Sequence, residues 1–301
     1  MNPRRRRMLI PGLLIALLVV VAVASLTGRA EASEATPVSR LGDPRITESS
    51  GLVVSATHDD LAYTINDSGH EPLVFAVRIS TGETVGVTRL DGVEVVDPEA
   101  IALHEGRLWV ADTGDNTASR SDVALLAFDE PGPGEHAVRP GRHLVTLDVP
   151  ADIEALLIRP EDGSLFLVTK TVGRADVYRA DARPAGTAVS FHRTDLVAPP
   201  VVTDGAFAPD GSSIALVSYL GVQVLDPISW ELRESLTLPQ LEQAESLAFL
   251  DARTVLVGSE GANSPLVALD VPAPPVPAIA VAALPAGGLA LVVSALRGLP
   301  L

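Results

Sequence analysis

The sequence predicts an all-β fold, a β-propeller with five four-stranded blades. Residues 38–271 are a series of short runs rich in Val, Leu, Ala and Ile, separated by turn residues, and they contain no amphipathic helix of useful length. One unit also recurs along these residues. A polar residue opens a short apolar run, a tight turn follows, and a second apolar run comes next. The clearest copy is DPEAIALHEGRLWVADTGDN, from Asp97 to Asn116.

The spacing of this unit is that of a propeller blade. The opening positions align at Ser50, Glu99, Glu154, Asp204 and Glu245, which are separated by 49, 55, 50 and 41 residues. Periods of about 40 to 50 residues, with four strands in each, are typical of propellers. The spacing therefore predicts that the apolar runs are the strands of consecutive blades.

The runs can be assigned to strands in chain order. The first unit predicts strands at residues 51–55, 61–65, 73–79 and 84–90. The second predicts 100–103, 108–111, 123–128 and 143–149, and the third 155–158, 165–169, 176–180 and 189–196. The fourth predicts 206–208, 214–218, 222–225 and 232–238. The fifth supplies only 246–250, 255–258 and 265–271, so its blade is one strand short.

The missing strand is expected at the N-terminal end of the domain. Ser39–Leu41 precedes Ser50 by the same nine-residue step that separates Leu90 from Glu99. A strand from one end that completes the blade at the other closes the ring and removes exposed sheet edges. Six blades are the alternative, if residues 131–143 contain a divergent blade.

Turn residues support this register. RPEDGS at residues 159–164 and APDGSS at residues 208–213 join the first strand to the second in two units, and Pro, Asp and Gly each favour a tight turn. F-x-P-D-G between two short strands resembles the hairpin of WD-repeat, TolB-type and YVTN-type propellers. ITESSGL, YTINDSG, DPEAIAL and LWVADTGDN resemble a group of exported bacterial propeller proteins. This resemblance covers residues 40–270 and implies an exported propeller.

Two apolar segments flank the propeller. Four arginines precede an uncharged run at residues 8–26, followed by a small-x-small site at residues 30–32, so residues 1–32 are expected to be a signal peptide or an N-terminal anchor. Residues 272–277 are a Pro-rich linker, and residues 278–297 are expected to hold a C-terminal transmembrane helix. The sequence thus predicts an exported domain, tethered at the extracytoplasmic face of the cell membrane.

Charge and cysteine content exclude several classes of function. The formal net charge is −16, which disfavours nucleic acid as a partner and leaves a soluble ligand or an extracellular protein. The chain has no cysteine, so it forms no disulfides and has no thiolate metal ligands. A single lysine, Lys170, stands against 21 arginines, which we interpret as codon bias.

Carboxylates are expected to gather at one mouth of the propeller channel. The loop that enters the first strand of a blade and the loop that leaves the second open on the same face. Oxygen-rich clusters suit Ca²⁺ or another divalent cation. The alternative is that these acids stabilise turns and keep the surface soluble. The candidate metal ligands are Asp67, Glu99, Asp112, Glu154, Asp204 and Glu245.

Catalytic motifs are sparse, so a binding module is favoured over an enzyme. The sequence has no nucleophile elbow, zinc-protease motif or phosphate-binding loop. The alternative is a metal-dependent hydrolase, a lactonase or phosphoesterase, in which His70 with Asp67 would act as general base at the same mouth. Six-bladed lactonases of the gluconolactonase type are similar in layout and bind a metal there, although their four ligand positions have no one-to-one match in this sequence.

Overall fold

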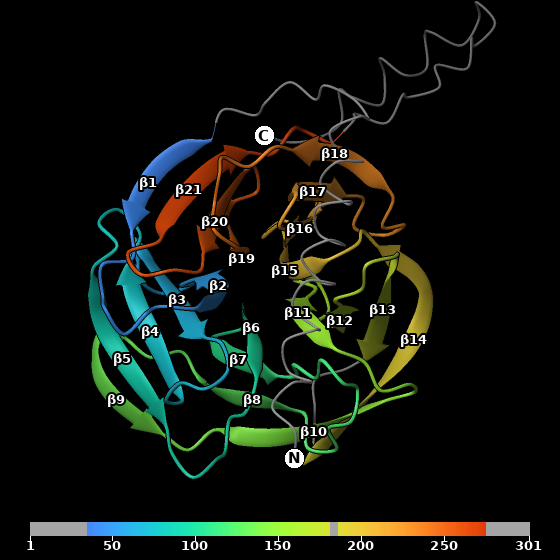
Figure 1. Cartoon of the computed structure of the whole chain (residues 1–301), viewed down its shortest axis with the longest axis horizontal. Helices are drawn as coiled ribbons and strands as arrows, with labels where there is room; N and C mark the ends of the chain where they lie inside the picture. Colours follow the sequence, from blue (N-terminus) through green and yellow to red (C-terminus); the bar gives the residue numbers. More distant parts are fainter. Residues whose placement is uncertain (1–34, 181–185, 275–301) are drawn as a thin grey trace, which may run out of the picture.

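The protein forms a ring of β-sheets around a central channel (Figure 1). The structure is a computed structural model that describes residues 35–180 and 186–274, and every regular element in these two ranges is a strand. Five strands line the channel, and each contacts the next around the ring. They are β2 (Ser49–Val54), β6 (Pro98–His104), β11 (Ile153–Ile158), β15 (Val202–Phe207) and β19 (Ala244–Asp251). The predicted all-β fold is confirmed.

Each inner strand begins a sheet that extends outward by antiparallel pairing. From β2 the order continues through β3 (Leu61–Asn66), β4 (Leu73–Arg78) and β5 (Thr84–Leu90). From β6 it continues through β7 (Arg107–Asp112) and β8 (Ala124–Asp129), and from β11 through β12 (Leu165–Thr169), β13 (Ala175–Ala180) and β14 (Ala188–Ala198). From β15 it continues through β16 (Ile214–Ser218), β17 (Gly221–Leu225) and β18 (Leu232–Leu236), and from β19 through β20 (Thr254–Ser259) and β21 (Pro265–Asp270).

The N-terminal strand completes the last sheet, as the sequence predicted. Strand β1 (Thr36–Arg40) pairs antiparallel with β21, so that Thr36 lies opposite Ala268 and Arg40 opposite Pro265. The edge of β21 is thereby covered by a strand from the other end of the described chain, next to it in Figure 1. This pairing joins the two ends of the domain without a covalent bond.

Residues 131–143 link neighbouring sheets and do not form a four-stranded sheet of their own. Strand β9 (Gly134–Val138) runs parallel to β5 at the outer edge of the first sheet. Strand β10 (Gly141–Leu147) pairs antiparallel with β8 and parallel with β14, which makes the second and third sheets continuous. The segment covers outer edges that would otherwise expose unpaired backbone groups.

The apolar core lies between neighbouring sheets. It divides into five clusters, and each cluster combines residues from two sheets that are adjacent in the ring. In one of them Phe166 packs against Phe207 and Trp230, with ring centroids 5.6 Å apart in both pairs. Trp109 and Trp230 are both buried and belong to two of these clusters. Burying a side chain of this size contributes roughly 1.5–3 kcal/mol.

The described part of the chain contains no helix that could cross a membrane. The segments predicted as membrane-inserted, residues 1–32 and 278–297, lie outside the described residues. Of the predicted Pro-rich linker, residues 272–274 are described and have no regular secondary structure.

Candidate functional site: an acidic mouth of the channel

A β-bulge near the start of each inner strand sets the side chains at one mouth of the channel. The pairing with the second strand skips one residue, which is Glu99 in β6, Glu154 in β11 and Glu245 in β19. Bulges redirect the side chain of the unpaired residue. In β15 the skipped residue is Thr203, so Asp204 lies one position further along than the sequence alignment placed it.

Two groups of carboxylates meet at this mouth. The first group is Asp67, Asp97 and Glu99. In this group and in the second, each residue contributes one carboxylate oxygen, and these oxygens all lie within 4.8 Å of one another. The second group is Asp67, Glu245 and Glu260. Asp67 follows β3 and belongs to both groups, so it connects the acids of the sheets on either side of its own.

The first group has little to neutralise it. Burial, Glu154, Asp67 and Asp97 raise the pKa of Glu99 well above its usual range, and Lys170 opposes this shift. Burial and the neighbouring Asp67 raise the pKa of Asp97 to about 6. Across the described ranges, no side chain donates a hydrogen bond to the carboxylate of Glu99. A Cβ on Gly114 would overlap carboxylate oxygens of Glu99 and Asp97, so this glycine lets the chain lie close against both.

The second group is supplied with hydrogen-bond donors. The hydroxyl of Tyr219 donates to Oε1 of Glu245 at 2.5 Å, and Nε2 of Gln243 lies 3.3 Å from the same oxygen. Gln243 also donates to Oε2 of Glu260 at 2.5 Å. Burial raises the pKa of Glu260 to about 8, and the adjacent Glu245 adds to the shift.

Lys170 lies among these acids. Its Nζ is 2.8 Å from Oε2 of Glu154 and 4.0 Å from Oε1 of Glu245. Burial lowers the pKa of Lys170, but Glu154, Tyr219 and Glu245 together raise it above its usual value, so the side chain stays charged. The interpretation of the single lysine as codon bias did not anticipate that it lies among the acids of the mouth. That it is the only lysine in the sequence was the signal that could have drawn attention to it.

Glu154 keeps one oxygen without a partner. Its side chain is 2% exposed, and Oε1 is buried without any hydrogen bond, whereas Oε2 accepts from Lys170. Burial raises the pKa of Glu154 to about 8, although Lys170 opposes the shift. A buried carboxylate oxygen with no donor is costly, and it indicates that a cation or another donor is required there.

Three of the six predicted ligands belong to neither carboxylate group: Glu154, which pairs with Lys170, and Asp112 and Asp204, which have other partners. Oδ1 of Asp112 accepts the backbone N–H groups of Val96 and Asp97 and pairs with Arg120 at 3.0 Å. Asp204 is fully buried and accepts backbone N–H groups from β2, β15 and β19. Neither residue belongs to a carboxylate group at the mouth. Asp97 and Glu260 belong to these groups instead. Asp97 precedes Glu99 by two residues, as Asp152 precedes Glu154, and Glu260 directly follows the second strand of its sheet, as Asp67 does.

His70 lies at the rim of the mouth. Its Nδ1 is 3.3 Å from Oε2 of Glu48 and 3.3 Å from the backbone oxygen of Asp67, and its Nε2 is 3.1 Å from the hydroxyl of Thr47. These contacts hold the ring against the loop that precedes β2. They engage the backbone of Asp67 and not its carboxylate, which is the group that a general-base pair would use.

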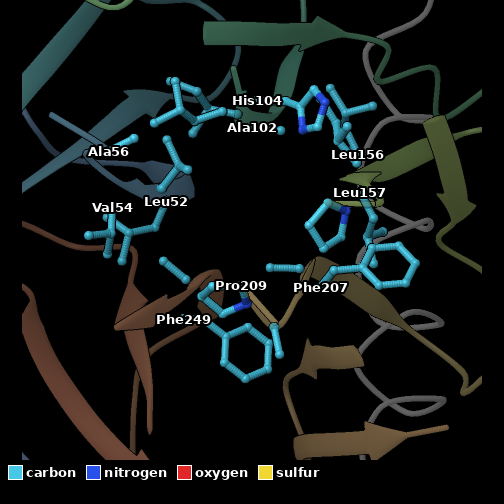
Figure 2. A pocket seen from close by; sticks show the side chains of 18 of the residues that line it. Leu52, Val54, Ala56, Ala102, His104, Leu156, Leu157, Phe207, Pro209 and Phe249 are labelled. Carbon is cyan, nitrogen blue, oxygen red and sulfur yellow. The ribbon is translucent and has the colours of Figure 1, made fainter. Parts of the chain in front are cut away.

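The opposite end of the channel has a different chemistry. A cavity of about 340 Å³ opens there between the inner strands and the hairpins that follow them. Figure 2 shows Leu52, Leu156, Leu157, Phe207 and Phe249 around this space, with His104 at its edge. The channel is therefore polar and acidic at one mouth and largely apolar at the other.

No family model and no curated protein sequence matches the chain. Among solved structures, a luciferin-regenerating enzyme is 11% identical over 80% of this chain and 98% of its own, with a TM-score of 0.50. A candidate gluconolactonase is 13% identical over 80% of this chain and 93% of its own, with a TM-score of 0.47. A chain of a nidogen/laminin complex is 14% identical over 75% of this chain and 77% of its own, with a TM-score of 0.46. The fold is propeller-like. At these identities the likeness concerns the fold alone.

Proposed function

We propose that this protein is a binding module whose acidic mouth holds a divalent cation. The observation that carries the proposal is the group of Asp67, Asp97 and Glu99, whose oxygens lie within 4.8 Å of one another. Two oxygens on opposite sides of Ca²⁺ are about 4.8 Å apart, because each binds at 2.3–2.6 Å. The group therefore has the dimensions of a coordination sphere for Ca²⁺ or a similar hard cation.

We further propose that the architecture is a five-bladed propeller. The five inner strands and the five core clusters support this count. A ring of this kind brings loops from several sheets to a common mouth, which is how acids far apart in the sequence come to share one site. The bound cation would then present open coordination positions to a soluble ligand or to an extracellular protein.

Calcium binding can be measured through stability. Saturating the protein with Ca²⁺ at about 100 times its dissociation constant should increase the free energy of unfolding by about 2.7 kcal/mol. Glu99→Gln removes a central ligand and should abolish the increase. Glu135→Gln, which removes an exposed acid on β9 away from the mouth, should leave it unchanged. A calcium-independent melting temperature in the wild-type protein would reject the cation site.

The same site could serve a metal-dependent hydrolase, and activity measurements distinguish the two. A binding module should show calcium-dependent stability without turnover of lactones or phosphoesters. Turnover that is lost in His70→Gln would instead favour the hydrolase, with His70 acting beside the cation.

Export and membrane tethering belong to the same proposal. Strand β1 begins and β21 ends on the face of the ring where hairpins join the first strand of each sheet to the second. Thr36 lies opposite Ala268 near the end of β21, and the N–H of Val271 donates to the backbone oxygen of Arg253 in the β19–β20 hairpin. Both flanking segments would then leave from the face opposite the acidic mouth. Val172 is 74% exposed on the mouth side, and the chain has no native cysteine. Failure of an impermeant maleimide to label Val172→Cys on intact cells would contradict this localisation.

A further inference from the structure

We propose that Lys170 acts as a built-in cation in one half of the acidic mouth, so that the mouth accepts one divalent cation and not two. This inference rests on the proposed function, since it concerns the same mouth. The two carboxylate groups share Asp67 and are similar in size. Their difference lies in what already neutralises them.

Lys170 makes the contacts that a bound cation would make. Its ammonium group is 2.8 Å from Glu154, 4.0 Å from Glu245 and 5.6 Å from the centroid of the Tyr219 ring. An ammonium group carries a full positive charge and three N–H donors. It also gains from a position over an aromatic face. Its side chain is 27% exposed, so solvent screens these interactions only in part.

Two further oxygens of this half also accept hydrogen bonds. Oε1 of Glu245 accepts from Tyr219 and Gln243, and Oε2 of Glu260 accepts from Gln243. A divalent cation there would have to displace these donors and approach Lys170 against charge repulsion. In the first group, Asp67 accepts the backbone N–H of Ser68, and the charges of Arg120 and Lys170 act on Asp97 and Glu99. No lysine or arginine of the described chain forms an ion pair with Asp67, Asp97 or Glu99.

A separate observation shows that the mouth still lacks positive charge. Oε1 of Glu154 is buried without a partner, and the charges of Glu154, Asp67 and Asp97 all act on Glu99. Lys170 thus neutralises the Glu154–Glu245 side and leaves the Glu99 side to an external cation. Because buried carboxylates are costly when unpaired, removal of Lys170 should open a second cation site.

The test is the number of Ca²⁺ ions bound by the full-length protein, measured by equilibrium dialysis and by isothermal titration calorimetry. The wild-type protein should bind one ion per chain, and Lys170→Met should bind two. Lys170→Arg retains the charge and should bind one. Arg174→Met is the matched control, because it removes a positive charge from the same loop, and among the described residues Arg174 is contacted through its backbone oxygen, by the hydroxyl of Thr171. It should also bind one.

Each outcome decides between the two proposals. One ion in both the wild-type protein and Lys170→Met would overturn the role of Lys170 and leave the cation site intact. Two ions in the wild-type protein would also overturn it. The absence of binding in every variant would reject the proposed function itself. If Lys170→Met does not fold, Lys170→Gln provides the same comparison, since it removes the charge and keeps N–H donors for Glu154. A change from one ion to two in Lys170→Gln would support the inference, and no change would reject it.

Discussion

Individual acids in this protein differ in role because their immediate neighbours differ. Asp204 and Glu99 both come from the start of an inner strand, and burial raises the pKa of each. Asp204, however, accepts N–H groups from Leu52 at 3.3 Å, Gly205 at 2.7 Å and Leu247 at 2.7 Å. Its carboxylate therefore ties three inner strands together, whereas Glu99 faces other carboxylates.

Asp204→Asn should destabilise the domain. The amide can keep only one accepting oxygen, so at least one buried backbone N–H loses its partner, at a cost of about 1–3 kcal/mol. Urea unfolding measures the difference. Asp129→Asn is the control, because its side chain is 95% exposed, and it should change the free energy of unfolding by less than about 0.5 kcal/mol. Equal effects of the two substitutions would show that Asp204 does not join the strands.

Among the elements, β1, β9 and β10 have a common purpose, which is to cover sheet edges. Strand β1 pairs with β21, β9 with β5, and β10 with both β8 and β14. Uncovered edges expose unpaired backbone groups and promote association between molecules. The position of β1 also depends on Gly82, in the β4–β5 hairpin of the first sheet, where a Cβ would overlap the backbone oxygen of Arg40.

Gly82→Ala should therefore weaken closure of the ring. Gly82 and Gly92 have nearly the same positive φ, 72° and 75°, but a Cβ on Gly92 meets nothing within 4 Å. In both alanine variants, backbone strain should lower the free energy of unfolding by about 1–2 kcal/mol. Gly82→Ala alone should lower the free energy of unfolding by about 2 kcal/mol more, because the added Cβ displaces β1. Thermal unfolding of the two variants measures the difference, and equal melting temperatures would argue against a contribution of β1 docking at this point.

At the scale of the whole molecule, the mouth concentrates negative charge on a protein that is already acidic. The net charge is −16, and burial is the first cause that raises the pKa of Asp97 to about 6 and of Glu154 and Glu260 to about 8. Elsewhere, pairing with Arg45 lowers the pKa of Asp43 to about 2, and backbone donors do the same for Asp226.

These shifts predict how stability depends on pH without a cation. An acid whose pKa is raised by folding contributes stability below its unfolded pKa, and this contribution is lost as the pH rises through the folded value. An acid whose pKa is lowered loses its contribution as the pH falls toward 2. In the presence of a chelator, the melting temperature of the wild-type protein should be highest near pH 4–5 and should fall between pH 5 and 8. The melting temperature of Glu260→Gln should fall less over this range. A melting temperature of the wild-type protein that rises from pH 5 to 8 would contradict the raised pKa values.

Local pattern determined most of the fold from the sequence alone. The alternation of apolar runs and Pro-Asp-Gly turns located the strands, because a hairpin depends on residues that are close in the chain. The repeated nine-residue step placed the closing strand, which pairs with β21 as predicted. The repeat also placed Asp67, Glu99 and Glu245 on one face, because strand direction follows from strand order.

Tertiary structure decided which of these acids meet and what neutralises them. The bulge in β15 skips Thr203, which directs Asp204 to backbone donors instead of the mouth, and sequence spacing does not reveal a one-residue skip. Lys170 reaches Glu154 within its own hairpin but approaches Glu245 from another sheet. Such contacts depend on how loops from separate sheets converge around a ring. That convergence is a property of sheet packing, and no local run of residues encodes it.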